Sequence, residues 1–344
     1  MANIKNVVTE IFDVDANNIP ESILDGGKPI IFRGLVNNWE FVNKARLGAQ
    51  EAASYLKSFY NGRPSLITKG HDGIGGRYFY NSEFTGLNFD SVKMRIDDAL
   101  DLIIKSAEDA SEPSIYLSSN GLDSHFPGFT QQNFLQPPRR KVSFPVHSVE
   151  AKIWIGTRSI ATCHYDALDN IACVVAGKRR FTLFPPEQFS NLYFGPLDPT
   201  PGGQAISLVD FDNPDYEAYP LFKFAEEAGF VAELEPGDAI YIPSMWMHHV
   251  EGLHPFNILV NYWWTDAPTY TGSAMNVLLH ALLSLRDKPD HEKKAWKHLF
   301  DYYVFNEPHQ SVDHIPEAMR GILAPLDESK SRRLRAMLLE KLNR

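Results

Sequence analysis

The sequence predicts a mainly β protein, in which an antiparallel sandwich or barrel is flanked by a mixed N-terminal region and a C-terminal helical cap. Three observations support this fold class. Short apolar runs with turn residues between them fill residues 115–264, a pattern typical of antiparallel β folds. Aromatic residues make up 12% of the chain, and such residues often fill β-rich cores. After residue 270, apolar residues recur with the period of a helix.

The N-terminal region combines short strands with one amphipathic helix. Residues 28–35 (KPIIFRGL) form an apolar run that ends in glycine, which indicates a buried strand. Residues 65–68 and 77–80 predict two further strands, separated by the turn-rich stretch GHDGIGG. Within residues 92–104, apolar residues fall on one helical face, so we expect a short helix there.

The central region consists of strand-like runs, namely SIYLSS, KIWIG, NIACVVAG, RRFTLF, FVAELEPGD, AIYIP and FNILVNYWW. Proline, glycine, aspartate and asparagine lie between the runs, as expected for strands joined by turns. The segment 185–229 is a long excursion between two strands and is rich in proline and aspartate. Long structured insertions are often functional. We therefore expect this segment and the N-terminal region to frame the entrance to a site in the β core.

The C-terminal region is predicted to be helical. Apolar residues at helical spacing mark three helices, around residues 278–285, 296–303 and 334–342. We therefore divide the chain into a β core with its N-terminal flanking elements, residues 1–270, and a helical region, residues 271–344. Exposed apolar faces mark interfaces, so the helical region predicts a homodimer.

Composition excludes several classes of protein. The net charge is −10 and no long run of Lys or Arg occurs, so we expect no direct binding of nucleic acid. No apolar stretch approaches the roughly 20 residues of a membrane span. The start, MANIKNVVTEIFDVD, has acids where a signal peptide needs an apolar core. The two cysteines, Cys163 and Cys173, cannot form a disulfide scaffold or a cysteine-rich zinc module. The sequence predicts a soluble cytoplasmic protein with no membrane contact.

A candidate metal site begins with His164 and Asp166 in the stretch CHYDALDN. Residues two apart in a strand point to the same side, so both can face a barrel interior. Two histidines and one carboxylate on one face of an octahedron leave three positions open, as in non-haem Fe(II) oxygenases. The stretch AIYIPSMWMHHV offers His248 or His249 as the third ligand, on a neighbouring strand. An isolated H-x-D occurs by chance in many proteins, so the argument depends on the joint pattern.

Several longer motifs occur in a fixed order, namely HYDALDNIACVVAGKRRFTLFPPEQFSNLY, VDFDNPDYEAYP, PGDAIYIPSMWMHHVEG and NYWW. Over about residues 20–270 the chain resembles the JmjC-type, cupin-like oxygenases, and most of all the asparaginyl hydroxylase called factor inhibiting HIF. The resemblance implies a double-stranded β-helix (jelly-roll) core and a catalytic domain within residues 1–270. It also implies an enzyme that uses Fe(II), O₂ and 2-oxoglutarate, releases succinate and CO₂, and hydroxylates or demethylates a substrate. A dimer formed through the C-terminal helices is implied as well.

The resemblance implies His164, Asp166 and His248 as the iron ligands. It favours His248 over His249 because the family ligand is the first histidine after the tryptophan-containing turn. Strand alternation also points the two neighbours in opposite directions, so only one of them can be a ligand.

The co-substrate pocket needs a group for the second carboxylate of 2-oxoglutarate, because an unpaired buried charge is costly. In KRRFTLF, alternation places Arg179 on the inward face with Phe181 and Leu183, and places Lys178 and Arg180 on the outer face. The family usually has lysine at the position of Arg179. Arginine can bind a carboxylate through two parallel hydrogen bonds, so we expect Arg179 to be the anchor.

The resemblance implies further pocket residues. The hydroxyl of Tyr116 is expected to help hold the distal carboxylate, and Asn170 and Asn261 to lie near the iron-bound carboxylate. Trp263 is expected to form a wall of the pocket. The chain departs from the family at Ala161, where a threonine is usual, although a threonine follows directly.

Two other functions stay open. Zn²⁺ also accepts two histidines and a carboxylate, so the chain could be a zinc-type hydrolase or isomerase that does not need 2-oxoglutarate. It could also be a non-catalytic binding module, although such drift should erase the ligands first. Arg179, Tyr116 and Asn261 argue against the zinc enzyme, which has no use for them. The substrate, a peptide or protein side chain or a small polar molecule, is undecided because fold does not fix substrate.

Overall fold

The computed structural model describes residues 2–109 and 112–343. These residues form two compact units, each described by itself below. The first unit holds the described residues up to 141 and residues 148–266, and the second holds residues 142–147 and those from 267 onward. The sequence places the division at residue 270, and the independence of the two parts as domains stays a prediction.

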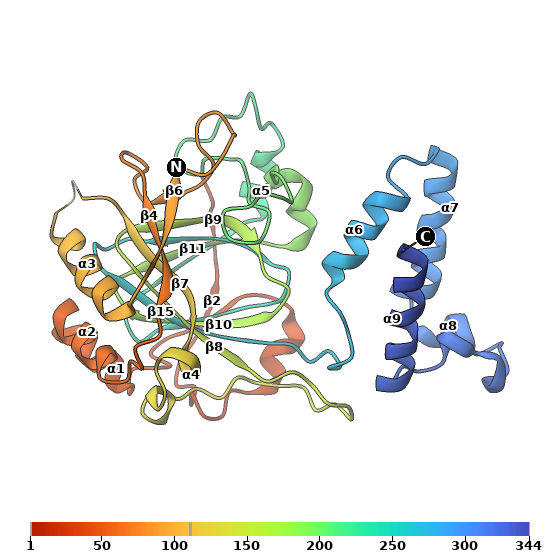
Figure 1. The fold of residues 1–344 in the computed structure, drawn as a ribbon, viewed down its shortest axis with the longest axis horizontal. Coiled ribbons are helices and arrows are strands. Elements are labelled where there is room, and N and C mark those ends of the chain that lie inside the picture. The colour runs from red at the N-terminus through yellow and green to blue at the C-terminus, as the bar shows by residue number, and fades with distance from the viewer. Residues whose placement is uncertain (1, 110–111, 344) are drawn as a thin grey trace. The chain divides into compact units, whose positions relative to one another are not determined.

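Two β-sheets make up most of the first unit (Figure 1). The six-stranded sheet contains, in spatial order, β1 (Asn6–Val7), β12 (Phe230–Leu234), β11 (Arg179–Phe184), β14 (Met247–Gly252), β9 (Ser159–Tyr165) and β5 (Arg77–Tyr78). The nine-stranded sheet contains β2 (Thr9–Ile11), β3 (Ile30–Phe32), β13 (Ala239–Ile242), β10 (Asp169–Ala176), β15 (Asn257–Trp264), β8 (Glu150–Gly156), β7 (Ile115–Gly121), β4 (Ser65–Gly70) and β6 (Phe89–Met94). The central strands pair antiparallel. The predicted mainly β fold with a jelly-roll core is confirmed.

Strand β10 packs on both faces, against the six-stranded sheet on one side and the N-terminal helices on the other. Its sequence, DNIACVVA, is almost continuously apolar because both faces of the strand are buried. Ala172 and Val174 face the six-stranded sheet and pack in a cluster with Phe181 of β11. Ile171 and Cys173 face the opposite way, into the cluster that contains the N-terminal helices.

Helices and the long insertion cover the outer faces of the two sheets. The apolar sides of α1 (Glu40–Leu47), α2 (Ala49–Lys57) and α3 (Ile96–Glu108) belong to the same core cluster as the nine-stranded sheet. The outer face of the six-stranded sheet packs against η3 (Pro186–Leu192) and α5 (Phe222–Ala228), which lie in the insertion. The central strands of both sheets are therefore shielded from water on their outer faces, and a cavity lies between the sheets.

Two N-terminal expectations need correction. The helix predicted over residues 92–104 begins at Ile96, because residues 92–94 belong to strand β6 and pair with residues 65–67 of β4. Strand β6 lies at a sheet edge and is largely exposed, so it lacks the apolar alternation by which strands are recognised. Helices α1 and α2 were missed because each spans little more than two turns before or after Gly48.

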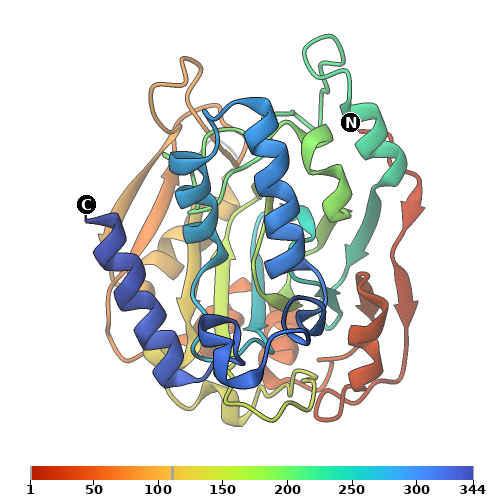
Figure 2. The same ribbon diagram turned by 90° about the vertical axis from the view of Figure 1, so that its right-hand side faces the viewer.

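The second unit is helical, as predicted, and is drawn in blue in Figure 2. It contains α6 (Ala274–Ser284), α7 (Asp290–Phe300), α8 (Pro308–Val312) and α9 (Glu328–Leu342). The hydroxyl of Ser273 accepts a hydrogen bond from the N–H of Met275 and caps α6. Leu285, which we expected inside the first helix, follows its last residue. Among the described residues, no helix is both long and apolar enough to cross a bilayer.

The predicted homodimer gives a first test. Helix α6 buries none of its side chains, and Leu283 is 80% exposed. We expect the full chain to sediment as a dimer at micromolar concentration and the Leu283→Glu variant to sediment as a monomer, because a buried carboxylate is costly. Leu66→Glu, at an exposed leucine of β4, is the control and should stay dimeric. A monomeric wild-type chain would contradict the prediction.

Candidate metal centre

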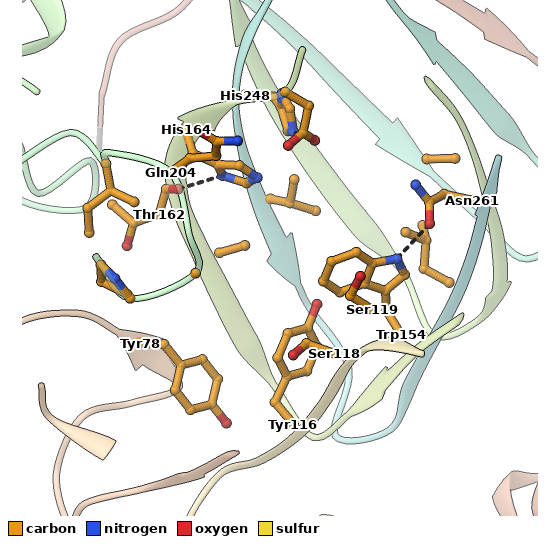
Figure 3. A pocket seen from close by; sticks show the side chains of 18 of the residues that line it. Tyr78, Tyr116, Ser118, Ser119, Trp154, Thr162, His164, Gln204, His248 and Asn261 are labelled. Carbon is orange, nitrogen blue, oxygen red and sulfur yellow. Dashed lines mark hydrogen bonds and ion pairs between the residues drawn. The ribbon is translucent and has the colours of Figure 1, made fainter. Parts of the chain in front are cut away.

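Two histidines of neighbouring strands meet inside the first unit. Strands β9 and β14 are antiparallel, and His164 lies directly opposite His248 in their register. The two imidazole centroids are 4.4 Å apart, and Figure 3 shows both rings at one end of a pocket. The Oδ2 atom of Asp166 lies 3.5 Å from Nε2 of His248. One ligand atom from each of the three residues lies within 4.8 Å of the others.

Backbone carbonyls fix the orientation of both imidazoles. The Nδ1 atom of His164 lies 2.9 Å from the carbonyl oxygen of Thr162, and Nδ1 of His248 lies 2.9 Å from that of Trp246. A carbonyl oxygen can only accept, so Nδ1 carries the proton in each ring. The Nε2 lone pairs are then free for a metal, which is the usual arrangement of metal-binding histidines.

The electrostatics favour the metal-binding protonation states. Burial, together with repulsion from His248, lowers the pKa of His164 to about 4, although Asp166 acts in the opposite direction. Burial alone would raise the pKa of Asp166, but the neighbouring imidazoles of His248 and His164 outweigh it and lower that pKa. A neutral imidazole and an ionised carboxylate are the forms that bind metals.

His249 points away from this cluster. Its buried ring stacks on Phe211, with centroids 4.6 Å apart, in the layer between the six-stranded sheet and the insertion. Burial, followed by the charge of Arg77, lowers the pKa of His249 to about 3. Strand alternation therefore brings His248, and not its neighbour, to Asp166 and His164.

Asp166 is held differently from the sequence expectation. It lies just after the end of β9 and not within a strand. Its carbonyl oxygen accepts a hydrogen bond of 2.8 Å from the N–H of Met245, a residue in the left-handed conformation with φ of 67°. The carboxylate of Asp169 accepts from the N–H of Ser244 at 3.2 Å and from the hydroxyl of Tyr241 at 2.8 Å. The turns that follow β9 and β13 are thus bonded together. These bonds join segments far apart in the chain, so they could not be predicted from local sequence patterns.

The three residues lie at a cavity of about 260 Å³ within the first unit. The indole N–H of Trp154 donates to Oδ1 of Asn261 at 2.7 Å, and the amide of Asn261 donates to Oδ1 of Asn170 at 3.1 Å. Trp263 stands edge-on to Trp154 and also lines the cavity. The structure therefore brings together Asn170, Asn261 and Trp263, all expected at the pocket. It also places Trp154, for which the sequence left pocket and core both open, at the wall of the cavity.

Arg179 lies in the same cavity and is 2% exposed. Among the described residues, its Nε and Nη2 atoms have no hydrogen-bond partner. Burial lowers the pKa of Arg179, and the neighbouring Tyr116 opposes that shift. Lys178 and Arg180 face outward, where both form ion pairs with Glu233. The structure thus places Arg179 and Tyr116 inside, and Arg179 is a buried cation without a carboxylate partner among the described residues.

Several lining residues were not expected individually. They come from the N-terminal region, from strand β7 and from the insertion, and are Thr68, Tyr78, Phe89, Ser118, Ser119, Pro201, Gly202, Gln204 and Ile206. The length of the insertion was the available signal for part of this set. Next to Ala161, the hydroxyl of Thr162 is buried and has no partner among the described residues, so a hydroxyl is present close to the position where the family has one.

Comparison with known proteins agrees with this geometry. The family model described as the cupin-like domain matches residues 16–270. The chain belongs to the cupin-like domain family. This family has the fold of metal-dependent oxygenases, and the His-Asp-His cluster is the matching candidate metal centre.

Curated relatives of this cupin-like chain include JmjC proteins. JmjC domain-containing protein F of Dictyostelium discoideum is 28% identical over 276 residues, which is 68% of this chain and 56% of that protein. The tRNA wybutosine-synthesizing protein 5 of Gallus gallus is 30% identical, covering 43% of this chain and 45% of its own. HSPB1-associated protein 1 of Bos taurus is 31% identical over 43% of this chain and 31% of that protein. The chain spans about half the length, or less, of these relatives. The closer resemblance to the asparaginyl hydroxylase stays a prediction.

The ligand assignment predicts a difference between the two adjacent histidines. We expect His248→Ala to weaken Fe(II) binding by at least ~100-fold, since losing a ligand should exceed the roughly 10–100-fold loss seen when an outer partner is removed. His249→Phe is the control, because it keeps a ring stacked on Phe211. Anaerobic calorimetric titration with Fe(II) measures both affinities. Loss of binding in the His249 variant alone would show that the assignment is wrong.

Proposed function

We propose that this chain is an Fe(II)- and 2-oxoglutarate-dependent dioxygenase that hydroxylates a substrate and releases succinate and CO₂. The observation that carries the proposal is Arg179. A buried guanidinium with two unpartnered nitrogen atoms lies in the same cavity as the His-Asp-His cluster. Leaving such a cation without an anion is costly, so the cavity is suited to a ligand that carries a carboxylate at one end and chelates a metal at the other.

The donor set fits Fe(II). His164, Asp166 and His248 supply two nitrogen atoms and one oxygen, which leaves positions for a bidentate co-substrate and for O₂. Bound Fe(II) would supply the oxidative chemistry, in which one oxygen atom of O₂ enters succinate and the other enters the substrate. Coordination needs ligand atoms with free lone pairs. The two backbone carbonyls hold the proton of each imidazole on Nδ1, and this leaves the lone pair of Nε2 free for the metal.

The remaining residues orient the co-substrate and keep water out. Arg179 would bind the distal carboxylate through parallel hydrogen bonds, with the Tyr116 hydroxyl beside it. The chain of hydrogen bonds from Trp154 through Asn261 to Asn170 fixes both amides at the wall of the cavity. Their side chains cannot rotate freely, so they are prepared to bind the end of the ligand near the metal.

The two alternatives account for less of the site. A zinc-type hydrolase or isomerase would use the three ligands but has no role for Arg179. A non-catalytic module would need neither. Arg179 is among the largest fully buried side chains of the first unit, and keeping it there without a ligand would only destabilise the fold.

We propose a peptide, protein or small polar molecule as the substrate. One relative is named for wybutosine synthesis in tRNA, so tRNA is the main competing substrate. Binding of nucleic acid depends on Lys and Arg contacts to phosphates, and this chain carries a net charge of −10. The charge therefore favours a substrate without a phosphate backbone.

The proposed activity predicts turnover that depends on both cofactors. With Fe(II) and 2-oxoglutarate, the wild-type chain should consume O₂ and form succinate, slowly without substrate and faster with it. Replacing Fe(II) by Zn²⁺ should abolish succinate formation, because Zn²⁺ has no redox chemistry. Oxygen-electrode traces and succinate quantification measure this. Zinc-supported hydrolysis without any use of 2-oxoglutarate would identify the alternative enzyme.

The anchor predicts a graded effect on co-substrate affinity. Removing one partner of a buried charge pair costs about 2–5 kcal/mol, so Arg179→Ala should weaken 2-oxoglutarate binding by roughly 30-fold or more. Arg179→Lys should retain much of the affinity, because it keeps a cation at that position.

The matched control is Lys178→Ala, which removes an outward cation and should change co-substrate affinity little. Anaerobic titration of the Fe(II) protein with 2-oxoglutarate, followed by the metal-to-ligand absorption band, measures all three variants. Loss of the band in the Lys178 variant, with retention in the Arg179 variant, would mean that the pocket assignment is wrong.

A further inference from the structure

We propose that the substrate group entering this cavity is uncharged and accepts a hydrogen bond, as an amide, a carbonyl or an alcohol does. The inference rests on the proposed function for the site's role, but its argument uses only the residues that line the cavity. Among those described residues, Asp166 and Arg179 are the only Asp, Glu, Lys or Arg side chains. All other lining residues are aromatic, aliphatic, small or neutral polar, apart from the two histidines.

The charges in the cavity balance with and without its proposed ligands. In the metal-free protein, the carboxylate of Asp166 and the guanidinium of Arg179 are one negative and one positive charge. With Fe(II) and 2-oxoglutarate bound, the metal and Arg179 bring three positive charges, and Asp166 and the two co-substrate carboxylates bring three negative ones. Once Fe(II) and 2-oxoglutarate are bound, a charged substrate group would therefore find no counter-ion left in the cavity, and burying it unpaired would be costly.

The aromatic walls do not provide a substitute partner for a cation. Tyr116 stacks on Tyr78 with centroids 5.7 Å apart and planes at 21°, so these two rings cover each other. Trp263 meets Trp154 edge-on at 5.8 Å and 83°. A cage for an ammonium group needs several ring faces turned toward one point, whereas here the rings pack on one another. Arg179 also lies beside Tyr116 and would repel a second cation.

An unpartnered donor indicates what a neutral group should offer. The indole Nε1 of Trp263 is buried and has no hydrogen-bond partner among the described residues. An indole N–H can only donate, so a ligand oxygen that accepts would satisfy it. Ser118, Ser119 and Gln204 add neutral polar groups to the lining. The cavity is thus polar enough for an amide or alcohol and lacks the charge needed for an ammonium or a carboxylate.

A pair of isosteric probes tests the inference. Choline and 3,3-dimethyl-1-butanol have the same shape and the same hydroxyl, and differ by one positive charge. Binding is measured by ligand-observed NMR on the metal-free full chain, and again with Fe(II) and 2-oxoglutarate under argon. With Fe(II) and 2-oxoglutarate bound, we expect the neutral alcohol to bind at least about tenfold more tightly, because choline would bury an unpaired charge. In the metal-free chain the carboxylate of Asp166 can pair with choline, so the preference should be smaller there.

A variant locates the effect in the cavity. Gln204→Glu adds one carboxylate to the lining with almost no change of shape, and should narrow or reverse the preference for the alcohol. Leu66→Glu, at an exposed position outside the lining, should leave it unchanged. Equal or tighter binding of choline by the wild-type chain, or no binding of the alcohol, overturns the inference. Failure of the wild-type chain to bind 2-oxoglutarate, which is measured separately from the two probes, would instead refute the proposed function.

Discussion

The antiparallel register of β9 with β14 is the constraint on which the rest of the site depends. It sets His164 directly opposite His248, and a shift of one residue would turn every side chain of β14 to the other face. His249 would then enter the cavity, and His248 would enter the apolar layer beside Phe211. The hydrogen bond between Met245 and Asp166 acts in the same direction, because it ties the turn before β14 to the backbone carbonyl of Asp166, just after β9.

The same sheet also sets the distance between the metal ligands and the buried cation. Strand β11 pairs with β14 so that Leu183 lies opposite His248 and Arg179 opposite Gly252. Four residues of strand separate the two levels, which is ~13 Å at 3.3 Å per residue. The long side chain of Arg179 can shorten that span, and what is left suits an elongated molecule with a carboxylate at each end. Strand pairing therefore sets the distance between the buried guanidinium and the metal ligands along one cavity.

The parts of the site that could be predicted are those determined by strand alternation. The inward direction of Arg179 and the opposed directions of His248 and His249 follow from a period of two, which is visible in the sequence. Contacts between distant segments could not be read in this way. The carboxylate of Asp169 accepts hydrogen bonds from the N–H of Ser244 and the hydroxyl of Tyr241, which are more than 70 residues further along the chain. Gln204 reaches the cavity from an insertion whose path depends on tertiary packing. Strand β6 was missed for a related reason, since an exposed edge strand has no buried face to impose a pattern.

The arginine at position 179 gives the cavity a more permanent positive charge than a lysine would, and so affects which ligands it can bind. A lysine in such surroundings can lose its proton, because desolvation lowers its pKa toward neutrality. Burial also lowers the pKa of Arg179, but a guanidinium starts so high that it keeps its charge. The cavity is therefore permanently positive at Arg179. The other charged side chain of its described lining, Asp166, lies beside the histidines. A ligand that satisfies both ends must be an anion at the arginine and a chelator at the metal, and any second molecule that shares the cavity has no charge left to pair with.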